Sequence, residues 1–178
     1  EGKAVGLSYF KERQISEEMI TKFQLGFSPS QRDAFTNEAL EKGYKREFLE
    51  KTGLSIFKED GKYFDRFSGR VIFPIHSVAG KIIGFGGRIL KEDKKTAKYL
   101  NSPESEIYNK SKTLYGVFFA KSSIVKSDKC YLVEGYTDVI SLHQSGITNV
   151  VASSGTSLTV EQIRLIKKFT KNVTIIYD

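Results

Sequence analysis

Residues Cys130–Asp178 have the sequence CYLVEGYTDVISLHQSGITNVVASSGTSLTVEQIRLIKKFTKNVTIIYD, and their pattern predicts the fold class. Short apolar runs alternate in it with longer amphipathic runs. The predicted strands are 130–133, 149–152 and 173–177, and the predicted helices are 137–145 and 159–170. The second helix begins with a T-x-x-Q capping box and has the predicted apolar face Val160, Ile163, Ile166 and Phe169. A β-α-β-α-β order of this kind predicts a parallel sheet.

Acidic residues stand at the ends of two of these strands. Glu134 follows the first strand and Asp178 follows the third, and ligands of a parallel sheet gather beyond the carboxyl ends of its strands. Because Mg²⁺ prefers oxygen ligands, the pair is a candidate metal site. The two carboxylates are expected to face each other across strand ends about 4.8 Å apart. A helix cap or a solvated loop residue is the alternative for each.

Two further features accompany this pair. Asp138 lies in the first turn of the helix after Glu134, where an acidic side chain also stabilises the helix dipole, and that support is the alternative to a catalytic role. The loop Ser153–Ser157 precedes a helix N-terminus, whose free N–H groups favour phosphate. Its candidate phosphate-binding residues are Gly155, Thr156 and Ser157. Cys130 lies in a strand buried on both faces and is expected to pack, not to react.

Upstream, residues 1–127 have the pattern of short helices followed by strands. Ser16 is a predicted N-cap, and helices are expected at 31–42 and 45–51, ended by Gly43 and Gly53. Asp60-Gly61 predicts a hairpin turn, and strands are expected at 70–76 and 82–85. Pro74 indicates an edge strand or a bulge. The predicted class is α/β (α+β), with one domain over 1–127 and a second over 128–178.

The charge is divided unevenly between these two parts. The chain has 178 residues and a net charge of +7; residues 1–127 hold 23 basic and 16 acidic side chains, and the rest holds five of each. This predicts a polyanion-binding region beside a neutral one, with lysines that serve solubility as the alternative. One cysteine and two distant histidines exclude a disulfide framework and a Cys/His zinc cluster. No apolar run approaches a membrane span, so a cytoplasmic protein is expected.

Several segments, taken in order, resemble the bacterial replicative DNA primases, whose catalytic core joins a basic α/β subdomain to a Toprim domain. Tyr131–Val139, Ala152–Thr159 and Ile175–Asp178 are similar to the first Toprim motif, the Gly-Thr loop and the opening of the Asp-x-Asp motif. Similarity to the basic subdomain is found at Arg66-Phe67, Gly69–Ile75, Gly84–Arg88, Lys98–Pro103 and Lys110–Gly116. The resemblance therefore covers almost the whole chain.

The resemblance implies a parent protein that makes short RNA primers on single-stranded DNA from ribonucleoside triphosphates. Mg²⁺ or Mn²⁺ is the implied cofactor, with Glu134 as metal ligand or general base, Asp178 as metal ligand and Asp138 in support. The implied DNA-binding residues are Arg13, Arg88, Lys98 and Lys110, with Tyr99 and Asn101 placed to stack on or hydrogen-bond a base.

The sequence also departs from the family. The second aspartate of Asp-x-Asp and the later acidic motif lie outside these 178 residues, as do the family's zinc-binding domain and its helicase-binding domain. We therefore expect a fragment that is inactive by itself. The alternatives are a phage or plasmid Toprim primase-helicase, a Toprim nuclease or topoisomerase, and a module that binds single-stranded DNA without catalysis.

Overall fold

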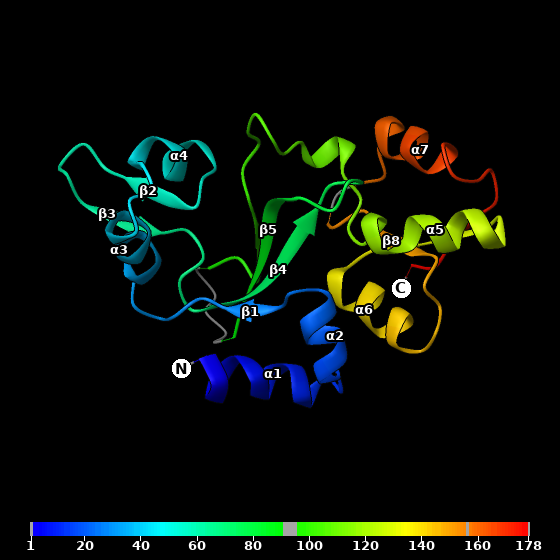
Figure 1. Ribbon diagram of the computed structural model, residues 1–178, viewed down its shortest axis with the longest axis horizontal. Helices are drawn as coiled ribbons and strands as arrows, with labels where there is room; N and C mark the ends of the chain where they lie inside the picture. The colour runs from blue at the N-terminus through cyan, green and yellow to red at the C-terminus, as the bar shows by residue number, and fades with distance from the viewer. Residues whose placement is uncertain (1, 91–95, 156, 178) are drawn as a thin grey trace. The chain divides into compact units, whose positions relative to one another are not determined.

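A computed structural model describes residues 2–90, 96–155 and 157–177 of the protein (Figure 1). The chain divides into one unit formed by residues 1–74 and 84–108 and a second unit formed by residues 75–83 and 109–178. Residues 109–127 fall in the second unit. The two compact units therefore do not meet at the predicted domain boundary between residues 127 and 128. That boundary separates the two domains expected from the family resemblance, and it stays a prediction.

The first unit is organised by a sheet whose strand order is β1-β4-β5-β6. These strands are β1 (Gly26–Phe27), β4 (Arg70–His76), β5 (Ile82–Ile89) and β6 (Tyr99–Asn101), and the ends of β4 and β5 extend into the second unit. A separate hairpin pairs β2 (Ser55–Phe57) with β3 (Tyr63–Asp65). The helices are η1 (Gly2–Gly6), α1 (Leu7–Glu12), α2 (Glu17–Lys22), α3 (Ala34–Glu41) and α4 (Arg46–Lys51).

Local signals in this unit act as predicted. The Ser16 hydroxyl accepts a hydrogen bond from the Met19 N–H at 3.3 Å and so caps α2. Gly43 and Gly53 follow α3 and α4 with φ of 84° and 66°, the left-handed conformation that ends many helices. Gly61, at φ 81°, lies in the turn between β2 and β3, so the predicted hairpin is confirmed.

The edge-strand prediction from Pro74 is wrong, because β4 lies between β1 and β5. The Arg70 carbonyl accepts a hydrogen bond from Ser28 on the β1 side. Backbone groups alternate along a strand, so Ile72 and Pro74 point to that same side. β1 pairs only with Val71 and Ile72. Pro74 therefore lies beyond the end of this short partner, where its missing N–H interrupts no ladder hydrogen bond.

The second unit contains a parallel sheet in which β7 (Cys130–Val133) lies between β8 (Val150–Ala152) and β9 (Val173–Ile175). α6 (Tyr136–Gln144) connects β7 to β8, and α7 (Val160–Lys167) connects β8 to β9. The two connections cross the sheet in opposite directions, and right-handed crossovers then place their helices on opposite faces. The predicted β-α-β-α-β parallel sheet is confirmed, and Glu134 follows its central strand.

α5 (Val117–Ser127) and α7 cover one face of this sheet. The core between them comprises Leu114, Val117, Ala120, Ile124, Cys130, Leu132, Val151 and Ile166. Burial raises the pKa of the Cys130 thiol to about 12, so almost no reactive thiolate is present at neutral pH. The expectation that Cys130 packs is confirmed.

The predicted apolar face of α7 is only partly correct. Val160 is 58% exposed and Ile163 is 42% exposed, whereas Gln162 is completely buried. Ile166, four residues after Gln162 and on the same side of the helix, is buried as predicted. The helix is rotated from the predicted orientation because its first turn packs on backbone carbonyl groups of the short helix η2 (Lys110–Lys112), which need hydrogen-bond donors.

Candidate catalytic and nucleic-acid-binding sites

Glu134 is the first residue after β7, at the carboxyl end of the parallel sheet. Its side chain is exposed and lines a hollow of about 340 Å³. The other residues that line this hollow are Ser153, Gly155, Ser157, Leu158 and Tyr177. The structure therefore brings Glu134 together with two of the three predicted phosphate-binding residues, Gly155 and Ser157; the third, Thr156, lies outside the described residues.

The backbone of the loop after β8 is attached to the end of β7. The Ser153 N–H donates to the Val133 carbonyl at 3.3 Å, and the Ser154 N–H donates to the Glu134 carbonyl at 3.0 Å. Ser154 and Gly155 are both left-handed, with φ of 63° and 78°. Gly155 adopts this conformation without strain, whereas it is uncommon for a serine, and the two residues turn the loop past Glu134. Two hydrogen bonds thus hold the candidate phosphate loop beside the candidate metal ligand.

Asp178 lies outside the described residues, so the predicted pairing of its carboxylate with Glu134 stays a prediction. Its neighbour Tyr177 lines the same hollow as Glu134. The register of β7 and β9 places Leu132 opposite Ile175. The chain that follows β9 is therefore directed toward the end of the sheet that carries Glu134.

Asp138 has a structural partner of its own. Its carboxylate accepts a hydrogen bond from the Gly135 N–H at 2.9 Å, across the first turn of α6. This contact satisfies one of the free N–H groups at the helix N-terminus. Asp138 also lines a second hollow of about 250 Å³ together with Glu134. The hydrogen bond thus supports the helix-stabilising role, one of the two roles predicted for Asp138. The shared hollow places Asp138 near Glu134 as well.

The donor atoms around Glu134 suit a hard divalent cation. The described lining of the hollow comprises the Glu134 side chain, the hydroxyl-bearing residues Ser153, Ser157 and Tyr177, and no residue that carries sulfur or imidazole. Among the described residues, no group of three or more His, Cys, Asp or Glu side chains is placed to hold a metal ion. The described residues thus fit one side of a magnesium site, with Glu134 as its carboxylate.

In the first unit, the predicted DNA-binding arginines surround a tyrosine. The guanidinium group of Arg88 on β5 lies 4.8 Å from the centre of the Tyr9 ring, and that of Arg13, at the end of α1, lies 4.9 Å from it. Burial raises the pKa of Tyr9, whereas the two guanidinium groups lower it. A hollow of about 630 Å³ here is lined by Val5, Ser8, Tyr9, Glu12, Arg13, Arg88 and Leu90.

Tyr99 extends this cluster. It lies opposite Arg88 in the register of β5 and β6, with the Arg88 guanidinium 6.0 Å from its ring centre. The Tyr99 side chain is exposed, as is that of its neighbour Lys98. Asn101 is half-buried on β6, and its carbonyl accepts a hydrogen bond from Arg66. The structure therefore brings Arg13, Arg88 and Tyr99 together around Tyr9, and Lys98 is the residue before Tyr99.

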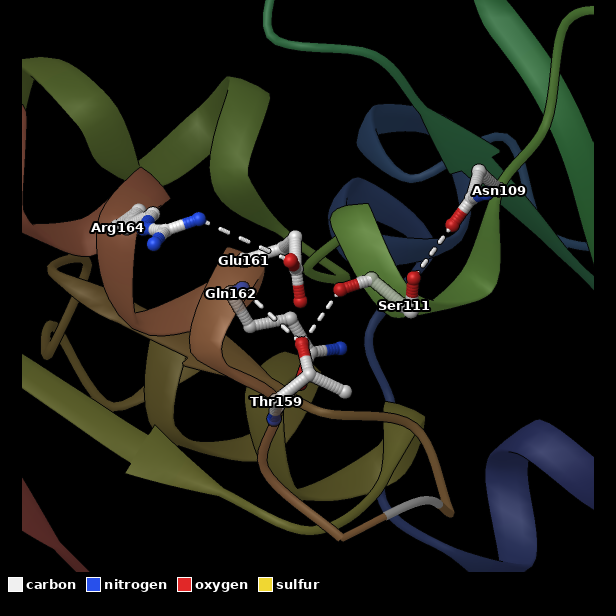
Figure 2. Close-up of polar contacts among 6 residues, drawn as sticks. All are labelled: Asn109, Ser111, Thr159, Glu161, Gln162 and Arg164. Carbon is white, nitrogen blue, oxygen red and sulfur yellow. Dashed lines mark hydrogen bonds and ion pairs between the residues drawn. The ribbon is translucent and has the colours of Figure 1, made fainter.

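Lys110 belongs to the second unit, in η2. Its carbonyl accepts a hydrogen bond from the buried Gln162 side chain at 3.3 Å. Next to it, the Ser111 carbonyl accepts from the Thr159 hydroxyl at 2.5 Å (Figure 2). The backbone of Lys110 is thus held on the first turn of α7, the helix that begins just after the candidate phosphate loop.

Comparison with known proteins decides the family. Residues 1–121 match the N-terminal domain of the DNA primase catalytic core, and residues 131–178 match a Toprim-like domain. The chain belongs to the DNA primase catalytic-core family. The resemblance found in the sequence is confirmed, and the match over residues 1–121 removes the basis for a Toprim nuclease or topoisomerase.

The similarity to individual primases extends over the whole chain. The DNA primase of Halalkalibacterium halodurans is 47% identical over 100% of this chain and 29% of the relative. The zinc-binding and RNA polymerase domains of Aquifex aeolicus primase give a TM-score of 0.89 at 42% identity, covering 96% of this chain and 42% of that one. A DnaG primase catalytic domain bound to single-stranded DNA gives 0.87 at 39% identity, covering 97% and 55%. The chain thus spans less than a third of the full-length primase relative.

In this primase-core chain, Arg70 lies near the predicted DNA-binding residues, although the sequence did not mark it as a site residue. Arg70 is buried, and its guanidinium group donates to the carbonyl groups of Gly87, Ala97 and Lys98 at 3.0 to 3.3 Å. Burial lowers its pKa. A Cβ atom at Gly87 would lie 2.6 Å from Phe67 Cδ1 and 3.1 Å from Arg70 Cδ, so this glycine makes room for both side chains. Two features of the sequence could have indicated this buried arginine: Arg70 stands at the start of an apolar strand, and the next strand contains the pair Gly86-Gly87.

Proposed function

We propose that this chain is the template-binding and metal-binding part of a bacterial replicative primase, which makes short RNA primers from ribonucleoside triphosphates on single-stranded DNA. The observation that carries the proposal is that Glu134, Gly155 and Ser157 line one hollow at the carboxyl end of β7, in a chain of the primase-core family. In the reaction, the primer 3′-hydroxyl attacks the α-phosphate of the incoming nucleotide and pyrophosphate leaves.

The proposed cofactor is Mg²⁺ or Mn²⁺, held by Glu134 and Asp178, with Asp138 in support. The ion, when bound, would stabilise charge on the attacking and leaving oxygens. Glu134 would act as a ligand or as the general base, and its exposure leaves its oxygens open to either task. The backbone N–H groups of the Gly155–Ser157 loop would orient the phosphates.

The proposed template track uses Arg13, Arg88, Lys98 and Lys110 as phosphate contacts, with Tyr99 and Asn101 against the bases. Two observations support it: two of the cations, Arg13 and Arg88, lie near Tyr9 and Tyr99, and a related catalytic domain has been solved bound to single-stranded DNA. Cations along a backbone bind without reading sequence, whereas exposed aromatic rings stack on any base. We therefore expect weak binding with little sequence preference.

A salt titration tests the track. If four cations each meet one phosphate, the slope of log K against log salt concentration should be about −3, at about −0.7 for each contact on a single strand. Lys98→Ala should reduce the slope by about 0.7 and weaken binding to all sequences alike. The measurement is fluorescence anisotropy of an unstructured oligonucleotide over a series of salt concentrations.

The matched control is Lys62→Ala, which removes the same charge from the hairpin between β2 and β3. The Lys62 ammonium is already paired with Asp60 at 3.0 Å, so its loss should leave the slope close to that of the unsubstituted chain. Equal effects of the two substitutions would mean that a diffuse positive field accounts for the binding, and the assignment of Lys98 to a phosphate would be withdrawn.

The second candidate function is a single-stranded-DNA-binding module without catalysis. It is favoured by the two arginines beside Tyr9 and by the related catalytic domain solved bound to single-stranded DNA, because binding of a strand needs cations and aromatic rings but no metal site. We expect the 178-residue chain to bind Mg²⁺ no tighter than millimolar, because Mg²⁺ gives up its water reluctantly to one or two carboxylates. Calorimetry that showed a tight stoichiometric site, or dinucleotide synthesis by this chain, would contradict the prediction.

The remaining partners are proposals for the whole protein. Ribonucleoside triphosphates are its proposed substrates, and a replicative helicase is its proposed protein partner, through a family domain outside these residues. Zinc would belong only to the family's zinc-binding domain. The described part of the chain contains no helix long and apolar enough to cross a membrane, and the cytoplasm is the proposed location.

A further inference from the structure

Gln162 occupies a position that an apolar side chain would normally fill. It lies on the inner side of α7, one turn before the buried Ile166, and is itself fully buried. Its Nε2 group donates to the Thr113 carbonyl at 2.8 Å and to the Lys110 carbonyl at 3.3 Å. Its Oε1 atom accepts from the Thr159 N–H at 3.2 Å. Both ends of the buried amide are therefore used, as burial of such a group requires.

Thr159 adds a third contact to the same segment. Its hydroxyl accepts from the Gln162 N–H at 3.1 Å, which completes the capping box, and it also donates to the Ser111 carbonyl at 2.5 Å. Figure 2 shows Thr159 between Gln162 and Ser111, which in turn donates to Asn109. Two side chains of α7 thus bind the carbonyl groups of Lys110, Ser111 and Thr113.

This attachment is more than a helix cap needs. The capping box itself uses Thr159 Oγ1 and Gln162 Oε1 with the two N–H groups of the helix N-terminus. The amide donors of Gln162 take no part in it; they bind the carbonyl groups of Lys110, in η2, and of Thr113, the residue after η2. The backbone hydrogen bonds of this 3₁₀ segment itself are those from the Lys112 and Thr113 N–H groups to the Asn109 and Lys110 carbonyl groups, at 3.1 and 3.4 Å. Because 3₁₀ hydrogen-bond geometry is poor, partners outside the segment add to its order. Gln162 supplies one such outside hydrogen bond, to the carbonyl group of Lys110 itself.

We propose that Gln162, with Thr159, is a positioning residue that holds Lys110 in place for a template phosphate. The inference rests on the proposed function in one respect, namely that Lys110 contacts DNA. The T-x-x-Q box then has a second task besides starting α7. By binding the carbonyl groups of Lys110 and Ser111, it holds the backbone of Lys110 on the helix that follows the candidate phosphate loop. Lys110 then meets a phosphate without first having to order its own segment.

Two substitutions test the amide donors of Gln162. Gln162→Glu keeps an oxygen acceptor for the Thr159 N–H, and so keeps the capping box, but removes the donors to the Lys110 and Thr113 carbonyl groups. Gln162→Met removes the donors and the acceptor without adding charge, so an effect that both variants share comes from the lost donors and not from the charge or the cap. Gln144→Glu, at the exposed end of α6, adds the same negative charge as the first variant and is the matched control.

The experiment measures binding of an unstructured oligonucleotide to the 178-residue chain over a series of salt concentrations, for each variant alone and combined with Lys110→Ala. Lys110→Ala should reduce the magnitude of the slope by about 0.7, and each Gln162 variant should do the same. The combined variants should bind no more weakly than Lys110→Ala alone, because a misplaced lysine has no contact left to lose. Gln144→Glu should leave the slope unchanged. Hydrogen exchange of the Lys112 and Thr113 amides should quicken in the Gln162 variants.

The other results overturn specific statements. If Gln162→Glu and Gln162→Met keep the full slope while Lys110→Ala reduces it, Gln162 does not position Lys110. If the effects of the two sites add, Gln162 acts only through general stability, and the inference is also wrong. If Lys110→Ala changes nothing while the chain still binds DNA, the inference fails and the rest of the template track stands. If the unsubstituted chain does not bind single-stranded DNA, the proposed function of the chain fails first.

Discussion

Glu134→Gln in the full-length primase should lower the rate of primer synthesis by at least about 10³-fold, which corresponds to about 4 kcal/mol of lost transition-state stabilisation. Glutamine keeps the size and polarity of the side chain but not its charge, so it is a poor ligand for a divalent cation and no general base. Because Glu134 is exposed, the substitution should leave the midpoint of thermal unfolding unchanged. Incorporation of labelled ribonucleotides on a single-stranded template measures the effect.

Asp138→Asn is the informative control for that experiment. Asparagine can still accept a hydrogen bond from the Gly135 N–H, so a residue that only supports α6 should lose little activity, less than about tenfold. A loss as large as that of Glu134→Gln would place Asp138 among the groups that act on the metal or the substrate. Full activity of Glu134→Gln would remove Glu134 from the proposed site.

Asp65→Ala should destabilise the protein by about 3 kcal/mol, the largest stability effect we expect from a single polar residue. The Asp65 carboxylate is buried at the end of β3 and accepts hydrogen bonds from the Phe35 N–H at 2.8 Å, the Thr36 N–H at 2.9 Å and the Thr36 hydroxyl at 2.6 Å. It thereby caps α3 from a distant strand. Alanine would leave these donors without their acceptor, and denaturant unfolding monitored by circular dichroism would measure the loss.

The matched control is Asp33→Ala. Asp33 is the residue immediately before α3, where a helix cap is normally found, yet its side chain makes no capping hydrogen bond. Its carboxylate instead accepts from the Gln31 side chain at 2.9 Å on the surface. We expect an unfolding midpoint close to that of the unsubstituted chain. A larger loss for Asp33→Ala than for Asp65→Ala would show that the local residue is the true cap.

Part of the site followed from the order of elements alone. A β-α-β-α-β pattern implies that the carboxyl ends of the strands lie at one edge of the sheet, and Glu134 and Ser153 each follow a strand directly. Their meeting in one hollow was therefore predictable without any long-range contact. The arrangement of Arg88 and Arg13 around Tyr9 was not, because it depends on how α1 packs on β5, and no spacing along the chain specifies that.

The features that could be predicted from the residues alone are local ones. Ser16 caps α2, Gly61 turns the β2–β3 hairpin, and Thr159 and Gln162 cap α7, because each of these signals acts over a few residues whose geometry is the same in any protein.

The long-range hydrogen bonds of partly and fully buried polar groups could not be predicted in this way, because they depend on the tertiary fold. Asp65 and Phe35 are 30 residues apart, Arg70 and Ala97 are 27 apart, and Gln162 and Lys110 are 52 apart. A buried polar group must find a hydrogen-bond partner, but which partner it finds depends on the path of the chain between the two. For that reason a helix can be capped from a remote strand, and a position predicted to be apolar can hold a glutamine.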